Sequence, residues 1–174
     1  MSRSIPTINT ARLTLRAMKA PDFDAFAALW ADPVVTDAIG VPVRSRPEAW
    51  RAFLQNAGHW EMTGFGQWAV EPHRAGRLAG QVGFFFGARG YGADFDPYPE
   101  AGWVLGPDAQ DQGFGREAAQ AAHDWFDRVI TGPLVCQVAQ GNARSLAVAK
   151  RMGYTPLRDS PDGTALLLFR KSPP

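Results

Sequence analysis

The spacing of hydrophobic residues predicts a chain that alternates between strands and helices. Residues 12–18 alternate apolar and polar positions, as a half-buried strand does. From Pro21 onward, apolar side chains recur at helical spacing. A second helix is expected after Ser45, because Ser45 and Glu48 have the spacing of a capping box. The Gly/Pro/Val-rich stretch from about 33 to 44 is expected to be a loop between these helices.

The remainder of the chain continues this alternation. A turn at 72–76 predicts a hairpin, and Asn142 and Gly153 are suited to begin and end the last helix. The further elements expected are strands 65–71, 77–86 and 100–105, helix 115–130, strand 133–139, a helix from Asn142 to Met152, and strands 154–158 and 164–170. This order predicts one mixed α/β domain over residues 1–174, with about seven strands and about four helices.

Charge and composition exclude several classes of protein. The 18 basic and 17 acidic side chains leave a formal net charge of +1, without the one-signed field that suits DNA or a membrane surface. Cys136 is the only cysteine, so no intramolecular disulfide can form, and no Cys/His spacing suits zinc. Neither a membrane-spanning run nor a secretory signal is expected. We therefore expect a cytoplasmic monomer or homodimer with no DNA, membrane or metal partner.

One glycine-containing segment has the clearest chemical signal. It follows a predicted strand and opens a predicted helix, where successive N–H groups and the helix dipole suit a pyrophosphate. Glycines allow unusual backbone conformations and a close ligand approach. The candidate phosphate ligands are Gln110, Asp111, Gln112, Gly113, Phe114, Gly115 and Arg116. A glycine turn that merely packs a strand against a helix is the alternative, whereas the Rossmann and P-loop fingerprints are absent.

The pattern Gln110-x-x-Gly113-x-Gly115 resembles the coenzyme A pyrophosphate loop of the GNAT superfamily of N-acetyltransferases. Residues 100–105 (Glu-Ala-Gly-Trp-Val-Leu) resemble the preceding strand in the RimJ/RimL-like branch, which acetylates N-termini of ribosomal proteins. Segments 10–16, 142–145 and 150–154 resemble the same branch, so the likeness covers nearly the whole chain. It implies the GNAT acyl-CoA N-acyltransferase fold, a central mixed twisted sheet with helices on both faces, and acetyl-CoA as co-substrate.

The resemblance also implies where acetyl-CoA binds. Its acyl chain is expected in a V-shaped gap between two parallel strands, 100–105 and 133–139. Backbone groups of Trp103, Val104 and Leu105 are expected to pair with the pantetheine like an added strand. One backbone N–H of that strand would polarise the thioester carbonyl and stabilise the oxyanion.

Glu100 and Ser145 are the candidate catalytic residues. The attacking amine must be neutral, and Glu100, expected at the entrance of the gap, would serve as base directly or through water. Many GNAT enzymes have a tyrosine that acts as the acid seven residues after the asparagine that corresponds to Asn142, but this chain has Ala149 at that position. The RimJ/RimL-like branch has a serine three residues after this asparagine, Ser145, which is expected to hydrogen-bond the leaving thiolate. Asn142 is expected to cap its helix and to contact the pantetheine.

Each of these assignments has a structural alternative. Glu100 could be a surface carboxylate at a strand end, and Ser145 a first-turn serine that satisfies backbone groups. The remaining reactive side chains are expected to be structural or solvated: His59, His73, His123, Cys136 and Tyr154.

The acceptor amine is left open by the sequence. The branch resemblance favours a protein N-terminal α-amine. Antibiotics, polyamines and amino acids are alternatives within enzymes, and a non-catalytic CoA-binding regulatory module is an alternative from another class. Asp94 and Asp96 lie beside Tyr91, Phe95 and Tyr98 in an acidic, aromatic loop that would suit a cationic acceptor or serve solubility only.

Overall fold

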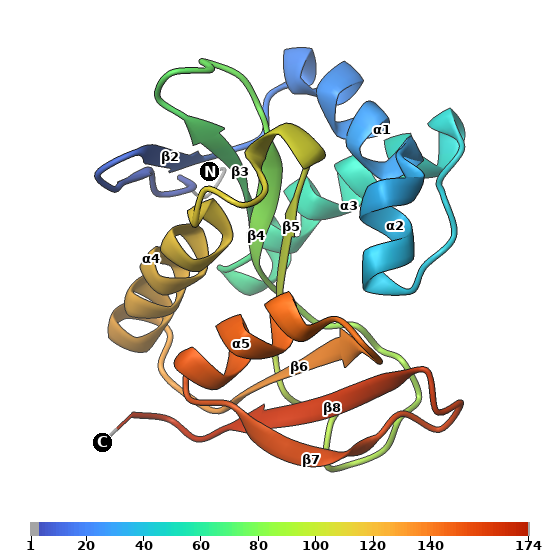
Figure 1. Ribbon diagram of the computed structural model, residues 1–174. Coiled ribbons are helices and arrows are strands. Elements are labelled where there is room, and N and C mark those ends of the chain that lie inside the picture. Colours follow the sequence, from blue (N-terminus) through green and yellow to red (C-terminus); the bar gives the residue numbers. More distant parts are fainter. Residues whose placement is uncertain (1–3, 174) are drawn as a thin grey trace.

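A computed structural model of the chain describes residues 4–173 and gives a mixed α/β fold (Figure 1). These residues form eight strands, five α-helices and two short 3-10 helices. In order they are β1 (Ile8–Asn9), β2 (Leu13–Arg16), η1 (Ala20–Asp22), α1 (Phe23–Ala31), α2 (Pro33–Ile39), α3 (Arg46–Thr63), β3 (Gln67–Pro72), β4 (Gly80–Phe85), β5 (Glu100–Leu105), η2 (Pro107–Ala109), α4 (Phe114–Val129), β6 (Leu134–Ala139), α5 (Ala143–Arg151), β7 (Thr155–Asp159) and β8 (Ala165–Arg170).

All eight strands belong to one sheet, in the order β1-β2-β3-β4-β5-β6-β8-β7. Neighbouring strands are antiparallel except β5 and β6, which are parallel and are connected through α4. These two strands pair at a single position, Glu100 opposite Val135, and then diverge (Figure 1). The V-shaped gap expected between them is therefore present.

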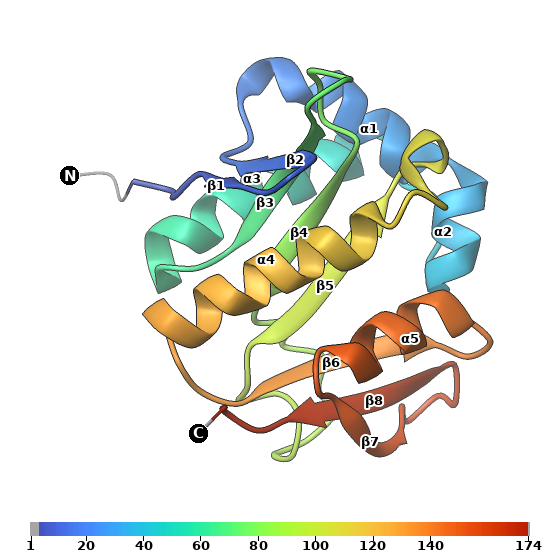
Figure 2. The same ribbon diagram turned by 60° about the vertical axis from the view of Figure 1, so that its left-hand side comes forward.

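Helices cover both faces of the sheet. Successive side chains of a strand point to opposite faces, and β3 shows this directly. Trp68 and Val70 pack in one apolar cluster with Phe126 of α4, whereas Ala69 packs in another with Phe26 of α1. Figure 2 shows α4 running along one face. This places the pyrophosphate-loop candidate at the start of α4, beside the end of β5.

A third cluster covers the far side of the C-terminal strands. The segment between β4 and β5 brings Phe95 onto Val135 of β6 and Leu167 of β8, and Tyr91 and Tyr98 pack around them. The aromatic residues of this acidic loop therefore belong to the core.

Residues 33–39 form the helix α2, so the prediction of a loop from about 33 to 44 is wrong for this part. The Asp32 carboxylate accepts a hydrogen bond from the Val34 N–H at 2.9 Å, and Pro33 occupies the first turn. Gly40 ends the helix in the left-handed region, with φ of 71°. Only 7 residues separate these signals, too few for the apolar periodicity to stand out.

Strand β1 was also not expected, because its two residues are too short to show an alternation. Within residues 4–173, no helix is both long enough and apolar enough to cross a membrane.

Candidate active site

The register of β4 and β5 determines which backbone groups face the gap. The Gly106 N–H donates to Ala79 O at 2.9 Å, so Gly106 belongs to a hydrogen-bonded pair with the β4 side. Because such pairs alternate along an antiparallel ladder, Val104 also directs its backbone groups to β4. Trp103 and Leu105 direct theirs the other way, where β6 has diverged. Two of the three predicted strand residues therefore present backbone groups to the gap, and Val104 contributes a side chain.

The loop before α4 leaves its amide groups open. Gly113 stands at the N-cap with φ of 76° and has no side chain to cap the helix. The first N–H groups of a helix lack intrahelical partners, so those of Phe114, Gly115 and Arg116 remain available to an anion. Gly115 itself is helical, so a substitution there causes no left-handed strain. The open donors fit the diphosphate of coenzyme A.

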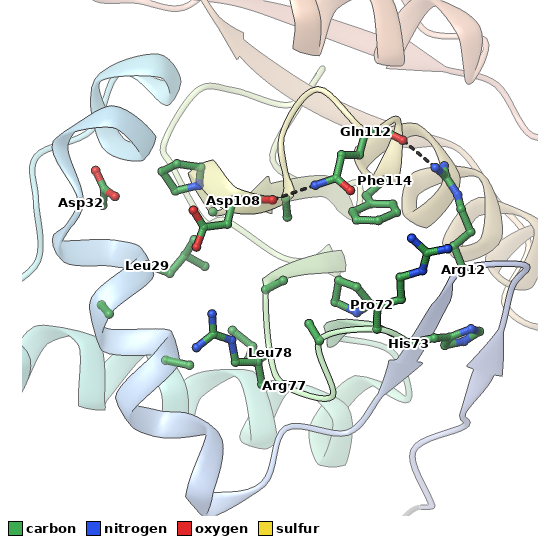
Figure 3. A pocket seen from close by; sticks show the side chains of 18 of the residues that line it. Arg12, Leu29, Asp32, Pro72, His73, Arg77, Leu78, Asp108, Gln112 and Phe114 are labelled. Carbon is green, nitrogen blue, oxygen red and sulfur yellow. Dashed lines mark hydrogen bonds between the residues drawn. The ribbon is translucent and has the colours of Figure 1, made fainter.

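Side chains outside the motif hold this loop in place. The Gln110 side-chain amide donates to Leu105 O at 3.0 Å, which ties the loop to β5. Arg12 donates to Gln112 O at 2.7 Å, forms an ion pair with Glu117 at 2.6 Å, and lies over the Phe114 ring (Figure 3). The local motif contains no signal for Arg12, because about 100 residues of chain separate it from the loop.

An exposed ion pair joins the loop to α5. Asp111, which has φ of 60°, contacts Arg144 at 2.8 Å between the side-chain oxygen and nitrogen. The pair connects the two elements that follow the diverging strands β5 and β6. Both side chains are mostly exposed, so the pair contributes little to stability.

Two cavities lie near these elements. The larger, about 740 Å³, lies between α1, the β3–β4 turn and the loop before α4 (Figure 3). Neither Glu100 nor Ser145 lines it. The smaller, about 280 Å³, is lined by Glu100, Ser145, Trp103, Val104 and Asn142. We take the smaller cavity as the candidate active site, because the predicted catalytic and pantetheine-contacting residues meet there.

Glu100 is buried, with 3% of its surface exposed. Arg89 holds both carboxylate oxygens, with Nε donating to Oε2 at 2.7 Å and Nη2 donating to Oε1 at 2.8 Å. Burial raises the pKa of Glu100, and the Arg89 guanidinium opposes that shift. The residue lies where β5 and β6 still pair, at the closed end of the gap, and not at the entrance as expected. No sequence motif pointed to Arg89.

Asn142 caps α5, as expected. Its side-chain oxygen accepts from the Ser145 N–H at 3.0 Å, and its amide nitrogen donates to Ala38 O at 2.7 Å, which joins α5 to α2. Ser145 is half-buried and lines the smaller cavity. Its hydroxyl makes no hydrogen bond to any of residues 4–173 and is free to meet a ligand.

His123 and Tyr154 form a buried pair away from both cavities. The His123 Nδ1 lies 2.7 Å from Ala119 O, which can only accept, so Nδ1 carries the proton and Nε2 accepts from the Tyr154 hydroxyl at 2.9 Å. Burial lowers the pKa of His123 to about 4 and raises that of Tyr154. Cys136 is buried and its thiol pKa is raised as well. These three residues have the structural roles expected of them.

The remaining histidines lie at the cavities without forming a metal site. The His59 Nε2 accepts from the Phe86 N–H at 2.9 Å, burial lowers its pKa, and its ring lines the smaller cavity. His73 lines the larger cavity. Over the described part of the chain, no group of three or more His, Cys, Asp or Glu side chains could hold a metal ion.

The acidic residues of the 87–99 loop do not line either cavity. Asp94 forms a two-point ion pair with Arg158 of β7, at 2.8 Å for each bond, and one oxygen of Asp96 accepts from the Gly92 N–H. Their contacts hold the loop against the C-terminal strands, so they are not placed to receive a cationic acceptor.

Comparison with known proteins shows the family to which the chain belongs. The family model of the acetyltransferase (GNAT) domain matches residues 12–155. A structure described as a GnaT-family acetyltransferase from Bordetella pertussis is 31% identical, covers 95% of this chain and 99% of its own, and has a TM-score of 0.84. An acetyltransferase from Agrobacterium tumefaciens is 33% identical, with 97% and 96% covered and a TM-score of 0.79.

A ribosomal-protein-S5-alanine acetyltransferase from Vibrio fischeri shares the fold at a TM-score of 0.76, with 17% identity and 97% of each chain covered. The extent of the domain match and the two relatives above 30% identity lead to one conclusion: the chain belongs to the GNAT family and is an acetyl-CoA-dependent N-acetyltransferase.

Proposed function

We propose that the protein transfers the acetyl group of acetyl-CoA to a primary amine by direct attack in a ternary complex, in the cytoplasm. The observation that carries this proposal is the single β5–β6 pair. Beyond this pair the two strands diverge, and backbone groups of Trp103 and Leu105 point into the gap between them. One cavity at this gap is lined by both Glu100 and Ser145.

Acetyl-CoA supplies an activated acetyl thioester, and this chain's residues would hold it along the gap. The open amides of Phe114, Gly115 and Arg116 suit the diphosphate, with the Arg116 guanidinium as a further contact. The backbone groups of Trp103 and the Leu105 N–H suit the amide groups of the pantetheine, whereas the Leu105 carbonyl already accepts from Gln110.

Three groups would then act on the reaction. Glu100 would take a proton from the ammonium, directly or through water, so that the amine nitrogen can attack the thioester carbon. A backbone N–H of Trp103 or Leu105 would stabilise the oxyanion. As the carbon–sulfur bond breaks, the nitrogen would keep its new bond to carbon and release its second proton to water. Ser145 would donate a hydrogen bond to the departing thiolate, which then takes up a proton from water.

The first candidate acceptor is a protein N-terminal α-amine, which assigns the chain to the RimJ/RimL-like branch. The resemblance at residues 100–105 and 142–145 supports it. An α-amine, with a reference pKa of about 7.7–8.0, is also roughly a tenth neutral at pH 7, whereas a lysine amine is almost fully charged.

The second candidate is a small amine such as an amino acid, an antibiotic or a polyamine. The cavity of about 280 Å³ supports it, because this volume is close to the lower end of the range of about 300–1,000 Å³ that is common for small-molecule pockets. A small cavity admits a small molecule or the first residues of a peptide.

An acceptor screen that follows free-thiol release from acetyl-CoA tests this function. Peptides with free N-termini, amino acids and polyamines are the acceptors, and calorimetry measures acetyl-CoA binding separately. We expect at least one class of amine to release thiol far faster than the hydrolysis background. Tight acetyl-CoA binding without release by any amine would contradict catalysis and favour a CoA-binding regulatory module.

A further inference from the structure

Arg44 is a cation without an ionic partner at the wall of the smaller cavity. It lies between α2 and α3, its N–H donates to Trp30 O at 2.9 Å, and its guanidinium carbon stacks 3.6 Å from the centre of the Trp30 ring. No ion pair or side-chain hydrogen bond links this guanidinium to another of residues 4–173. The stacking holds a half-buried cation that has no direct ion pair among these residues.

Other partly buried arginines contrast with Arg44. Carboxylate partners raise the pKa of Arg16, Arg89 and Arg170. Burial lowers the pKa of Arg44, and the charge that opposes this shift is that of Glu48. The Glu48 carboxylate is engaged by Ser45 at the start of α3. A ligand with a negative charge would supply the partner that the fold lacks.

The cavity around Arg44 has an excess of positive charge. The ionisable residues that line it are Arg44, His59, Arg89 and Glu100. Arg89 and Glu100 neutralise each other, and His59 uses Nε2 to accept the Phe86 N–H, which requires the neutral ring. The remaining charge is that of Arg44. A polyamine would bring further positive charge to it, whereas a carboxylate would be attracted.

A chain of buried hydrogen bonds adds a second donor. The Trp30 Nε1–H donates to Gln81 Oε1 at 3.1 Å, and Gln81 Nε2 donates to Gln67 Oε1 at 2.9 Å. An indole N–H can only donate, so the orientation of both amides follows from it. The chain ends on the Gln67 amide nitrogen, beside Gly102 of β5. A second donor is thus available in the cavity that Arg44 lines.

We propose that the acceptor amine bears a carboxylate, which pairs with Arg44 on the Trp30 platform, and that the Gln67 amide is a further donor to the acceptor. The proposal rests on the acetyl transfer proposed above. Two sources present this chemistry: a free amino acid, through its α-carboxylate, and a peptide with Asp or Glu at its N-terminus. Arg44 is then a specificity-determining residue, which acts on the choice of acceptor and not on the transfer itself.

Matched acceptors test the charge requirement and distinguish the sources. Free amino acids are compared with their amides, and C-terminally amidated peptides that begin with Asp or Glu are compared with those that begin with Asn or Gln. Spermidine is the cationic comparison. We expect the carboxylate member of one pair to have a kcat/KM larger on the order of 10- to 100-fold, as for a charge-assisted hydrogen bond.

Substitutions of Arg44 test whether this residue causes the preference for a carboxylate acceptor. Arg44→Met should raise KM for the carboxylate acceptor by a similar factor, with kcat and acetyl-CoA affinity nearly unchanged. Arg44→Glu should reverse the preference within the matched pair. Arg46→Met is the control: Arg46 also stacks on a ring, that of Phe23 at 4.6 Å, but lies outside the cavity, so its loss should leave the preference intact.

A binding experiment separates this proposal from the transfer reaction. With CoA present, N-acetylated amino acids or peptides should bind the wild-type protein more tightly than their uncharged counterparts, and Arg44→Met should remove the difference. This result would stand even if no acceptor were turned over. Equal binding of both members of every pair, a wild-type preference for spermidine, or equal KM changes for carboxylate and amide in Arg44→Met would overturn the proposal.

Discussion

The Glu100 carboxylate is held at two points by Arg89 and shielded from water. Burial favours the protonated form, whereas the guanidinium favours the ionised form, and the pKa remains above its usual range. A carboxylate with a raised pKa takes a proton from an ammonium more readily. Arg89 is in this sense a positioning residue, because it fixes the direction of the two oxygens.

Glu100→Gln should lower turnover at neutral pH by roughly 100-fold, the lower range for a general base. Raising the pH should recover part of the loss, because more of the amine is then neutral without help. Acetyl-CoA affinity should change little. The pH–rate profile of thiol release measures this, with Arg89→Lys as a comparison that keeps the charge but loses the two-point contact. A profile identical in wild type and Glu100→Gln would rule out the role.

Ser145→Ala should reduce turnover on the order of 10- to 100-fold, or about 1.4 to 2.8 kcal/mol, the effect of one hydrogen bond to a developing charge. An acyl donor with a better leaving thiol should reduce the defect. Steady-state kinetics measure both effects. Tyr154→Phe is the comparison, because the Tyr154 hydroxyl is buried and donates to His123. Normal turnover in Ser145→Ala with none in Tyr154→Phe would move the acid to Tyr154.

At the scale of elements, the loop before α4 and the edge of β5 would divide the binding of acetyl-CoA between them. Both would bind through backbone groups, so the side chains contribute mainly by leaving space for the cofactor. Gly113 provides the left-handed turn, and the absence of a capping side chain leaves the helix amides uncovered. Binding through backbone should therefore respond to added bulk more than to lost side chains.

Gly115→Val should weaken acetyl-CoA binding at least about tenfold, or 1.4 kcal/mol, because branched carbons would stand where a phosphate approaches. The fold should survive, since an added Cβ would lie 3.5 Å from Leu105 Cδ1, an ordinary contact, and φ is unstrained. Calorimetry provides the affinity. Gly58→Val is the matched control, as that helical glycine has no other side chain or backbone within 4 Å of an added Cβ.

An unchanged affinity in Gly115→Val would contradict the assignment of the loop. Arg116→Ala should give a smaller loss, which shrinks as salt is added, because the exposed guanidinium acts through a screened charge.

Elements with a clear period or cap could be predicted from the sequence. The first long strand, expected over 12–18, and the helix after Ser45 could be predicted because an alternation and a capping box lie within a few residues. The helix α2 was missed although Asp32 and Gly40 are ordinary cap residues, because a short segment rich in Val and Pro gives no helical period.

The candidate site divides in the same way. Gly113 and Ser145 stand in contiguous motifs and could be named from sequence. Arg89, Arg12 and Arg44 could not, because each acts on a partner through the fold or through a particular side-chain conformation. In the acidic loop the sequence instead indicated a role that the structure does not support. Asp94 was a candidate contact for a cationic acceptor, but its carboxylate pairs with Arg158.

The whole molecule consists of two sheet portions that share one strand pair. Strands β1–β5 form one and β6–β8 the other (Figure 1). On the α4 face, His123 contacts Tyr154 and Asp127 holds Arg170 at 2.8 and 2.6 Å. On the opposite side the 87–99 loop packs over β6 and β8. These contacts maintain the fold while the gap between β5 and β6 stays open.

His123 should make the stability of the whole protein depend on pH. Its pKa is about 4 when folded, against 6.5 for an unperturbed ring, so between these values the unfolded chain binds more protons. Stability should therefore be fully present above pH 6.5 and fall as the pH drops toward 4, by about 3 kcal/mol at most.

Urea unfolding at several pH values measures this dependence. The double variant His123→Leu/Tyr154→Phe removes both partners together, so the hydroxyl is not left unpaired, and it should show a shallower slope than wild type over this range. Identical slopes would show that the ring does not titrate on unfolding.

The single β5–β6 pair has a consequence for how the chain could be divided. Each sheet portion is one continuous stretch of sequence, and the turn between α4 and β6 contains Thr131 and Gly132, both with positive φ. Opening the chain there would give two fragments that recognise each other through the α4 surface and through the 87–99 loop over β6 and β8, with a single β5–β6 pair between their strands. In the proposed binding mode acetyl-CoA touches both fragments, so it should favour their reassociation, which would make the fold a scaffold for a split reporter of the metabolite.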